Sequence, residues 1–148
     1  MLDAGSMAFE AKASPVGASK VLAIDPAHTR LVIFDEGRVK IATWHETRDP
    51  ARKTVRYWQT REDLPVVREA RRIPVVSFSP DGKRIATTRY GGFTLWGLKG
   101  EHFRQLAEFY GHMGTVKQLA FSRDGMQLAT AGEDRTIRIW DVDPDREL

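Results

Sequence analysis

The sequence predicts an all-β fold, and three observations lead to this class. Short runs of β-branched and aromatic residues recur along the chain, as in FTLW and TIRIW. Turn sequences that contain glycine, such as SPDG and SRDG, separate these runs, as hairpin connections do. No segment has the apolar spacing of an amphipathic helix. We therefore expect short strands joined by tight turns.

The composition is that of an ordinary folded protein and excludes several kinds of chemistry. The chain has 148 residues, of which 41% are hydrophobic and 29% are charged, as is usual for globular domains. It contains no cysteine, which excludes disulfides, thiolate metal sites and cysteine nucleophiles. Because the sequence has neither a membrane-length apolar run nor an export signal, we expect it to be cytoplasmic.

The net charge of +3 is concentrated in one segment. Residues 46–72 contain eight basic and five acidic residues, whereas the rest of the chain is balanced. This surplus is too small for a general nucleic-acid-binding protein, but it favours a local acidic partner.

An internal repeat organises the chain. Phe34, Phe78 and Phe121 are separated by 44 and 43 residues, and each is followed by a polar turn with glycine and then by Ala-Thr. Each copy also closes on a tryptophan that ends a β-rich run. These tryptophans are Trp58, Trp96 and Trp140.

The last copy resembles the WD40 repeat almost residue for residue. The resemblance runs from Gly111-His112 through FSRDG and LATAGEDRTIRIW to Trp140-Asp141, and the first two copies resemble degenerate members. It implies four-stranded blades that form part of a β-propeller. We expect a flexible tail at 1–19, three repeats at about 20–59, 60–97 and 98–141, and a short acidic end.

In the WD40 family, a repeat begins with the outer strand d of one blade and continues with strands a, b and c of the next. This order predicts strand d at Lys20–Ile24 in the first copy, about 62–67 in the second and about 102–109 in the third. The third blade then has no outer strand of its own.

Because three blades cover only part of a ring, we expect the propeller to be completed by oligomerisation or by a partner chain. The simplest closure is head-to-tail between two or three copies, in which Val21, Leu22, Ala23 and Ile24 of one chain form strand d of the next. The rival is a chain, or a missing portion of this one, that supplies the remaining blades.

The resemblance also implies a hydrogen-bonded tetrad in the third copy, made by His112, Thr130, Asp134 and Trp140. A half-buried histidine needs partners for both ring nitrogens, and an indole N–H needs an acceptor. We therefore interpret the four residues as structural rather than as a catalytic dyad with a threonine nucleophile.

The tetrad is incomplete in the other copies. The second retains Thr87 and Trp96 but has Gly91 at the aspartate position. The first retains Thr43 and Trp58, with Asp49 as a possible turn acid and Asp25 where Gly-His would lie. We expect these blades to be less rigid than the third.

The sequence predicts no catalytic, metal or cofactor site. His28, His45 and His102 lack the spacing of metal ligands. The alternating aspartates from Asp141 to Asp145 resemble the opening of a calcium loop but lack its glycine and glutamate, so we interpret them as a solvated end. We expect a protein that is not an enzyme and that binds no cofactor.

The stretch from Thr43 to Trp58 is five residues longer than its counterpart in the third copy. We expect it to share the top face of the propeller with the connection at 68–72, because b–c and d–a loops lie together in WD40 propellers. Aromatic and arginine side chains are typical of interface hot spots, although a solvated loop is the alternative. The candidate partner-binding residues are Trp44, Arg48, Arg52, Lys53, Arg68, Arg71 and Arg72.

These observations predict a non-catalytic protein-interaction scaffold that assembles head-to-tail into a ring, with no membrane association. The alternative is a C-terminal segment of a larger WD40 propeller that acts as a regulatory or sensor domain. A nucleic-acid-binding module is disfavoured because acids are interleaved with the arginines.

Overall fold

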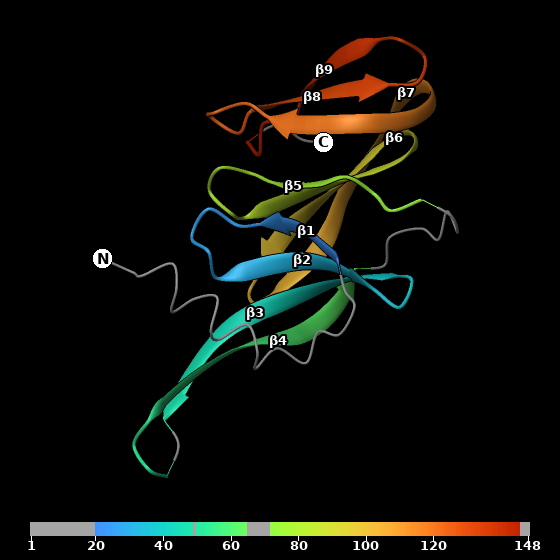
Figure 1. Ribbon diagram of the computed structural model, residues 1–148. Coiled ribbons are helices and arrows are strands. Elements are labelled where there is room, and N and C mark those ends of the chain that lie inside the picture. Colours follow the sequence, from blue (N-terminus) through green and yellow to red (C-terminus); the bar gives the residue numbers. More distant parts are fainter. Residues whose placement is uncertain (1–19, 49, 65–71, 146–148) are drawn as a thin grey trace.

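The computed structural model describes residues 20–48, 50–64 and 72–145, and these residues form strands and turns (Figure 1). All of the strand pairs are antiparallel, so the predicted all-β class is confirmed. Within the described ranges, no helix is long and apolar enough to span a membrane. The strands are β1 (Lys20–Ile24), β2 (Arg30–Asp35), β3 (Arg38–Arg48), β4 (Thr54–Leu64), β5 (Val76–Phe78), β6 (Arg84–Lys99), β7 (His102–Phe121), β8 (Gln127–Gly132) and β9 (Ile137–Asp141).

Strands β1 to β4 form one four-stranded sheet in chain order, which we call blade 1. Strand β1 is hydrogen-bonded to β2, with Ile24 opposite Leu31. It is therefore strand a of its own blade. The prediction that Val21, Leu22, Ala23 and Ile24 form the outer strand of a neighbouring blade or chain is wrong.

The turn after β1 explains this correction. Asp25 takes the place that serine has in the SPDG and SRDG turns: its carboxylate accepts the Thr29 and Arg30 N–H groups at 2.7 and 2.9 Å. His28, with φ of 57°, takes the left-handed position that Gly82 occupies in SPDG. The segment DPAH is thus an a–b turn without the usual glycine.

The strands of the first repeat consequently differ from those predicted by matching the three sequence copies. Ala42-Thr43 lies in the third strand of its blade, whereas Ala86-Thr87 lies in the second. Gly37 lies in the b–c turn, between β2 and β3. Trp58 belongs to β4, the outer strand, and the predicted repeat boundary at 59 falls inside that strand.

Blade 2 is made by β5, two segments of β6 and the first part of β7. The Leu98 N–H donates to the Lys83 carbonyl at 2.7 Å, so residues 92–99 run back along residues 84–90. Gly91, with φ of 81°, lies in the turn between these segments. Residues 102–110 of β7 pair with residues 92–99, and the predicted outer strand at 102–109 is confirmed.

Blade 3 consists of residues 116–121 of β7 with β8 and β9. Among the described residues, no strand pairs with the far edge of β9. The predicted tail at 1–19 and the last three residues lie outside the described part of the chain.

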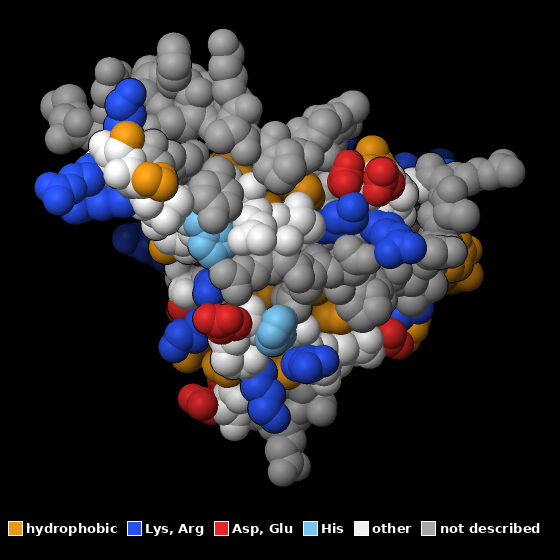
Figure 2. Space-filling view, turned by 90° about the horizontal axis from the view of Figure 1, so that it is seen from below, with side chains coloured by type: hydrophobic (Ala, Val, Ile, Leu, Met, Phe, Trp, Pro, Cys, Tyr) orange, Lys and Arg blue, Asp and Glu red, His pale blue; other side chains and the backbone are white. Residues whose placement is uncertain are grey.

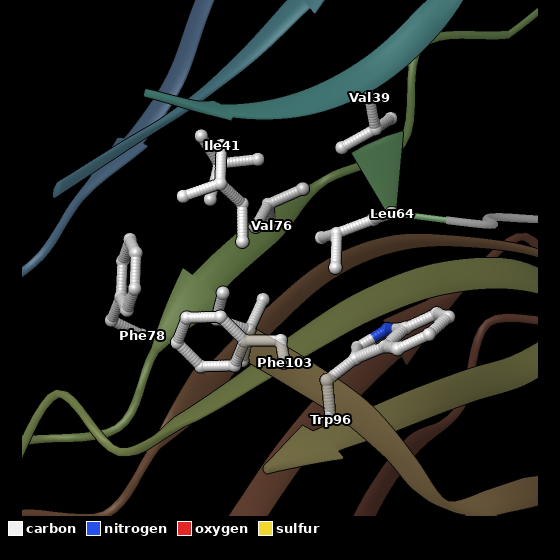
Figure 3. Close-up of a cluster of buried hydrophobic side chains, with 9 residues drawn as sticks. Val39, Ile41, Leu64, Val76, Phe78, Trp96 and Phe103 are labelled. Atoms are coloured by element: carbon white, nitrogen blue, oxygen red, sulfur yellow. The ribbon is translucent and has the colours of Figure 1, made fainter. Parts of the chain in front are cut away.

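Blades 1 and 2 pack face to face through an apolar cluster, which we call the first seam (Figure 3). The inner strands β1 and β5 lie beside one another at this contact. Burial of these side chains stabilises the packing by removing apolar surface from water. The buried members are Val32, Val39, Ile41 and Leu64 of blade 1 and Val76, Phe78, Ile85, Trp96 and Phe103 of blade 2.

A second seam joins blades 2 and 3. Phe93 is stacked on Phe109, with ring centroids 4.6 Å apart, and meets the edge of Trp140 at 5.5 Å. Such aromatic contacts add to the energy of burial. The buried members of this seam are Ala86, Phe93 and Leu95 of blade 2 and Leu119, Leu128 and Val142 of the third blade and its end.

Arg84 adds a polar link across the second seam. Only 6% of this residue is exposed, and its guanidinium donates to the carbonyl oxygens of Gly125 and Val142. The guanidinium also lies 5.5 Å from the centre of the Phe121 ring. The side chain therefore holds the turn and the end of blade 3 against blade 2.

We expect Arg84→Met to lower the free energy of unfolding by about 1 to 3 kcal/mol, because two buried carbonyls lose their donor. Urea unfolding measures this change, and Lys83→Met at the adjacent exposed position is the control. Equal stability of both variants and the parent would show that Arg84 does not link the blades.

Candidate functional site

The structure brings the four predicted tetrad residues together in blade 3. His112 Nδ1 lies 3.0 Å from both Asp134 carboxylate oxygens, and Nε2 lies 2.7 Å from Thr130 Oγ1. The Trp140 indole N–H donates to the same hydroxyl at 2.8 Å. One tautomer satisfies all these bonds: Nδ1–H donates to Asp134, and Nε2 accepts from Thr130.

The order of these hydrogen bonds is that of a catalytic triad of nucleophile, base and acid. The residues are nevertheless buried, as side chains in a protein interior are. Thr130 is only 1% exposed, and its hydroxyl oxygen already accepts the Trp140 N–H. A nucleophile must reach a substrate in a site next to its base. The geometry therefore favours a structural role for Thr130 and His112.

Backbone donors hold the Asp134 carboxylate in its charged form. The Met113 N–H donates to it at 2.9 Å, and His112 and Thr136 supply further hydrogen bonds. These bonds outweigh burial and keep the pKa of Asp134 well below its ordinary value of 3.8. The carboxylate thus joins the β8–β9 turn to the connection that precedes the inner strand of blade 3.

We expect Thr130→Val to lower the free energy of unfolding by about 1 to 2 kcal/mol, because the buried His112 and Trp140 nitrogens lose a shared partner. Thr54→Val, at the exposed start of β4, serves as the control and should change stability by less than about 0.5 kcal/mol. Chemical denaturation that finds the two variants alike would contradict the buried network.

The Asp134 network also predicts an acid dependence of stability. A carboxylate whose pKa is lowered on folding stabilises the protein above its unfolded pKa of 3.8, and this contribution is lost as the pH falls below that value. The stability difference between the parent and Asp134→Asn should therefore shrink as the pH is lowered from about 5 to about 2. Denaturant titrations across this range measure it, with Asp145→Asn as the control. A difference that does not vary with pH would contradict the argument.

Blade 2 retains the Thr–Trp pair of the tetrad, and blade 1 has apolar residues at both corresponding positions. The Trp96 indole N–H donates to Thr87 Oγ1 at 3.0 Å, and both residues are buried. In blade 1 the a–b turn aligns Ile33 and Ala42 with these two positions, and both are buried apolar residues. The assignment of Thr43 and Trp58 as their counterparts is wrong.

The candidate partner-binding residues do not form one surface. Arg48 pairs with Thr54 at the tip of the β3–β4 hairpin, whereas Val39 pairs with Leu64 at its opposite end. Arg72 instead contacts Thr115 and Glu133, at the third blade. Trp44, Arg52 and Lys53 are at the tip end, and Arg68 and Arg71 lie outside the described residues. The predicted common face is wrong because the long loop joins strands c and d.

Arg72 is engaged by blade 3. Its guanidinium donates to Glu133 Oε1 at 2.9 Å and to Thr115 Oγ1 at 3.0 Å. Lys117 Nζ lies 2.7 Å from the same carboxylate oxygen. The hydrogen bond from Lys117 has the largest effect on Glu133, and together with the Arg72 and Thr115 contacts it lowers the pKa of this carboxyl group to about 2. Nothing in the sequence indicates that Glu133 and Lys117 lie beside Arg72, because these residues meet only through the packing of blades 2 and 3.

A second polar cluster also escaped the sequence analysis. Arg89 Nη1 lies 2.5 Å from Glu108 Oε1, and the guanidinium stacks over Tyr110, 4.8 Å from the ring centre. The Tyr110 hydroxyl donates to Glu108 at 2.9 Å. Nothing in the spacing of these residues signals the cluster, since it forms only when β6 pairs with β7.

The described residues contain no group of three or more His, Asp or Glu side chains arranged to hold a metal ion. The polar clusters described above are hydrogen bonds and ion pairs within blade 3, within blade 2 and between Arg72 and blade 3.

Comparison with known proteins identifies one segment of the chain. The family model described as "WD domain, G-beta repeat" matches residues 103–141. This segment is a WD40 repeat. The match begins in the outer strand of blade 2 and ends with β9, which is the d-a-b-c order that the resemblance implied, and the WD40 repeat predicted for this part of the chain is confirmed.

Curated relatives of the WD40 repeat match parts of the chain. WD repeat-containing protein 1 of Mus musculus is 39% identical over 75 residues, which are 49% of this chain and 12% of that protein. Target of rapamycin complex subunit LST8 of Saccharomyces cerevisiae is 26% identical over 92 residues, which are 60% of this chain and 30% of that protein. The chain thus spans less than a third of these relatives.

A solved structure shares the fold of this chain. The crystal structure of Chaetomium thermophilum Sqt1 matches with a TM-score of 0.63 and 22% identity, covering 82% of this chain and 30% of that one. The arrangement of blades is therefore found in a known protein structure, although only as part of a longer chain.

Proposed function

We propose that the chain is a non-catalytic protein-interaction module of the WD40 type. The observation that carries this proposal is the buried state of the tetrad: the one triad-like arrangement among the described residues is 1% exposed at Thr130 and fully engaged in packing. Two apolar seams hold the blades as a scaffold for their turns and edges. Binding surfaces on proteins often use loops supported by such rigid elements.

The relatives support the same function. One of them is named a subunit of the target of rapamycin complex, and a subunit must contact other proteins. The partner of this chain is a separate question, since the chain spans only 30% of that relative. Action as a regulatory part of a larger propeller is the alternative form of the proposal.

The open side of blade 3 is the proposed assembly surface. Ile137 is 76% exposed and Ile139 is 62% exposed, and both belong to β9, the edge strand. An exposed edge with apolar side chains invites pairing with another chain. We propose that a second copy covers this side in a head-to-tail assembly, while a different complementing chain is the rival occupant. The strand donor is not β1, which is already paired.

We expect the parent protein to have the solution mass of two or more chains, each of 16.8 kDa. Ile137→Asp combined with Ile139→Asp should shift it to a single chain, because charges on the contact cannot be buried. Light scattering coupled to size exclusion measures the masses, with Lys99→Asp as an exposed control. A monomeric parent that melts cooperatively would refute assembly with a copy and with a complementing chain.

Nucleic-acid binding has less support. Arg48, Arg52 and Lys53 lie near the tip of the β3–β4 hairpin, whereas Arg72 is paired with Glu133 of blade 3. A continuous basic stripe is the usual footprint for a phosphate backbone. The surface charge of the described residues therefore favours a protein partner.

A further inference from the structure

Strands β3 and β4 extend beyond the rest of blade 1. Strand β2 pairs with β3 only as far as Thr43, opposite Arg30. Residues 44–48 therefore pair only with residues 54–58 of β4. We call residues 44–58 the β3–β4 arm. Figure 1 shows this arm projecting at the lower left, away from the blades above it.

Two tryptophans hold the base of the arm. Trp44 lies opposite Trp58, and their ring centroids are 5.1 Å apart at an angle of 58°. The Trp44 N–H also donates to the Thr29 carbonyl at 2.9 Å, which ties the arm to the a–b turn. A bare two-stranded ribbon is marginally stable in water, and cross-strand aromatic pairs stabilise such ribbons. The tryptophan pair thus stabilises the arm at its base.

The tip of the arm is basic and exposed. Arg48, Arg52 and Lys53 are all exposed, and Arg52 lies in the left-handed region with φ of 62°. No ion pair joins Arg48 or Arg52 to another residue that the structure describes. In the view of Figure 2, Lys and Arg side chains gather at the left margin of the molecule. Among the residues that the structure describes, the guanidinium groups of Arg48 and Arg52 therefore have no carboxylate paired with them.

We propose that the β3–β4 arm binds an acidic segment of a partner protein. Arg48 and Arg52 would pair with its carboxylates, since the planar guanidinium can donate two parallel hydrogen bonds to one carboxylate. The half-buried Trp44 and Trp58 rings would offer apolar contact beside these charges. The inference rests on the proposed interaction function and names its surface and partner class.

A peptide fits the arm better than a nucleic acid does. A phosphate backbone is bound by many cations along a track, whereas Arg48 and Arg52, whose side chains the structure describes, both lie near one turn. Spaced carboxylates of an acidic protein segment match this arrangement.

The test uses the full chain and a fluorescein-labelled Glu/Asp-rich peptide that contains one phenylalanine. We expect Arg48→Ala combined with Arg52→Ala to weaken binding about tenfold or more, measured by fluorescence anisotropy. The matched control is Lys83→Ala with Lys99→Ala, which removes the same charge from exposed positions outside the arm. This control should change the affinity by less than about twofold. Thermal melting verifies that both variants fold.

Four outcomes would overturn the proposal. Equal weakening in the two variants would show attraction by net charge alone. Tighter binding of single-stranded DNA of equal charge would favour a nucleic acid. Unchanged binding in the arginine variant, or no binding by a folded parent, would remove the arm as the site.

The outcome for the arm is separable from that for the interaction function. Chemical crosslinking and light scattering of the same preparations report protein contacts that do not involve the arm. If contacts persist while the arm fails to bind the peptide, only the arm proposal fails. If the parent neither assembles nor binds any peptide, the interaction function fails as well.

Discussion

The packing of one sheet face against the next is the interaction on which the structure depends. Blade 2 is covered on both sides, by the first seam around Ile85 and Phe103 and by the second around Phe93 and Leu95. Alternate residues of a strand point to opposite faces, so Ile85 faces one neighbour and Ala86 the other. Each blade supplies a face that its neighbour needs, and polar links such as that of Arg84 fix how the faces meet.

The same constraint explains why the polar networks are structural. The Trp140 ring is packed against Phe93 and Phe109 in the second seam, which places its indole N–H beside Thr130. A buried donor needs an acceptor, and the Thr130 hydroxyl and His112 provide the chain of bonds that ends at Asp134. The two surfaces that we propose for binding, β9 and the β3–β4 arm, are instead an exposed edge strand and a projecting hairpin.

The sequence was sufficient to predict the blades whose local chemistry is distinctive. Blade 3, its tetrad and blade 2 could be predicted because their glycine turns and hydrogen-bonding side chains are separated by regular numbers of residues in the sequence. The strands of blade 1 were assigned incorrectly from the sequence for two reasons. Ala42-Thr43 has the same local pattern in strand c that Ala86-Thr87 has in strand b, and His28 replaces a turn glycine. The Arg72–Glu133 pair could not be predicted, since residues 61 positions apart meet only through packing between blades.

Native-state hydrogen exchange tests most directly whether face-to-face packing holds the blades. Opening blade 2 exposes both seams, whereas opening blade 3 exposes only the second. Amides of β5 and β6 should therefore exchange more slowly than those of β9 and of the β3–β4 arm, because protection follows the free energy of local opening. Exchange in β5 and β6 as fast as in β9 would contradict the dependence of the structure on its two seams.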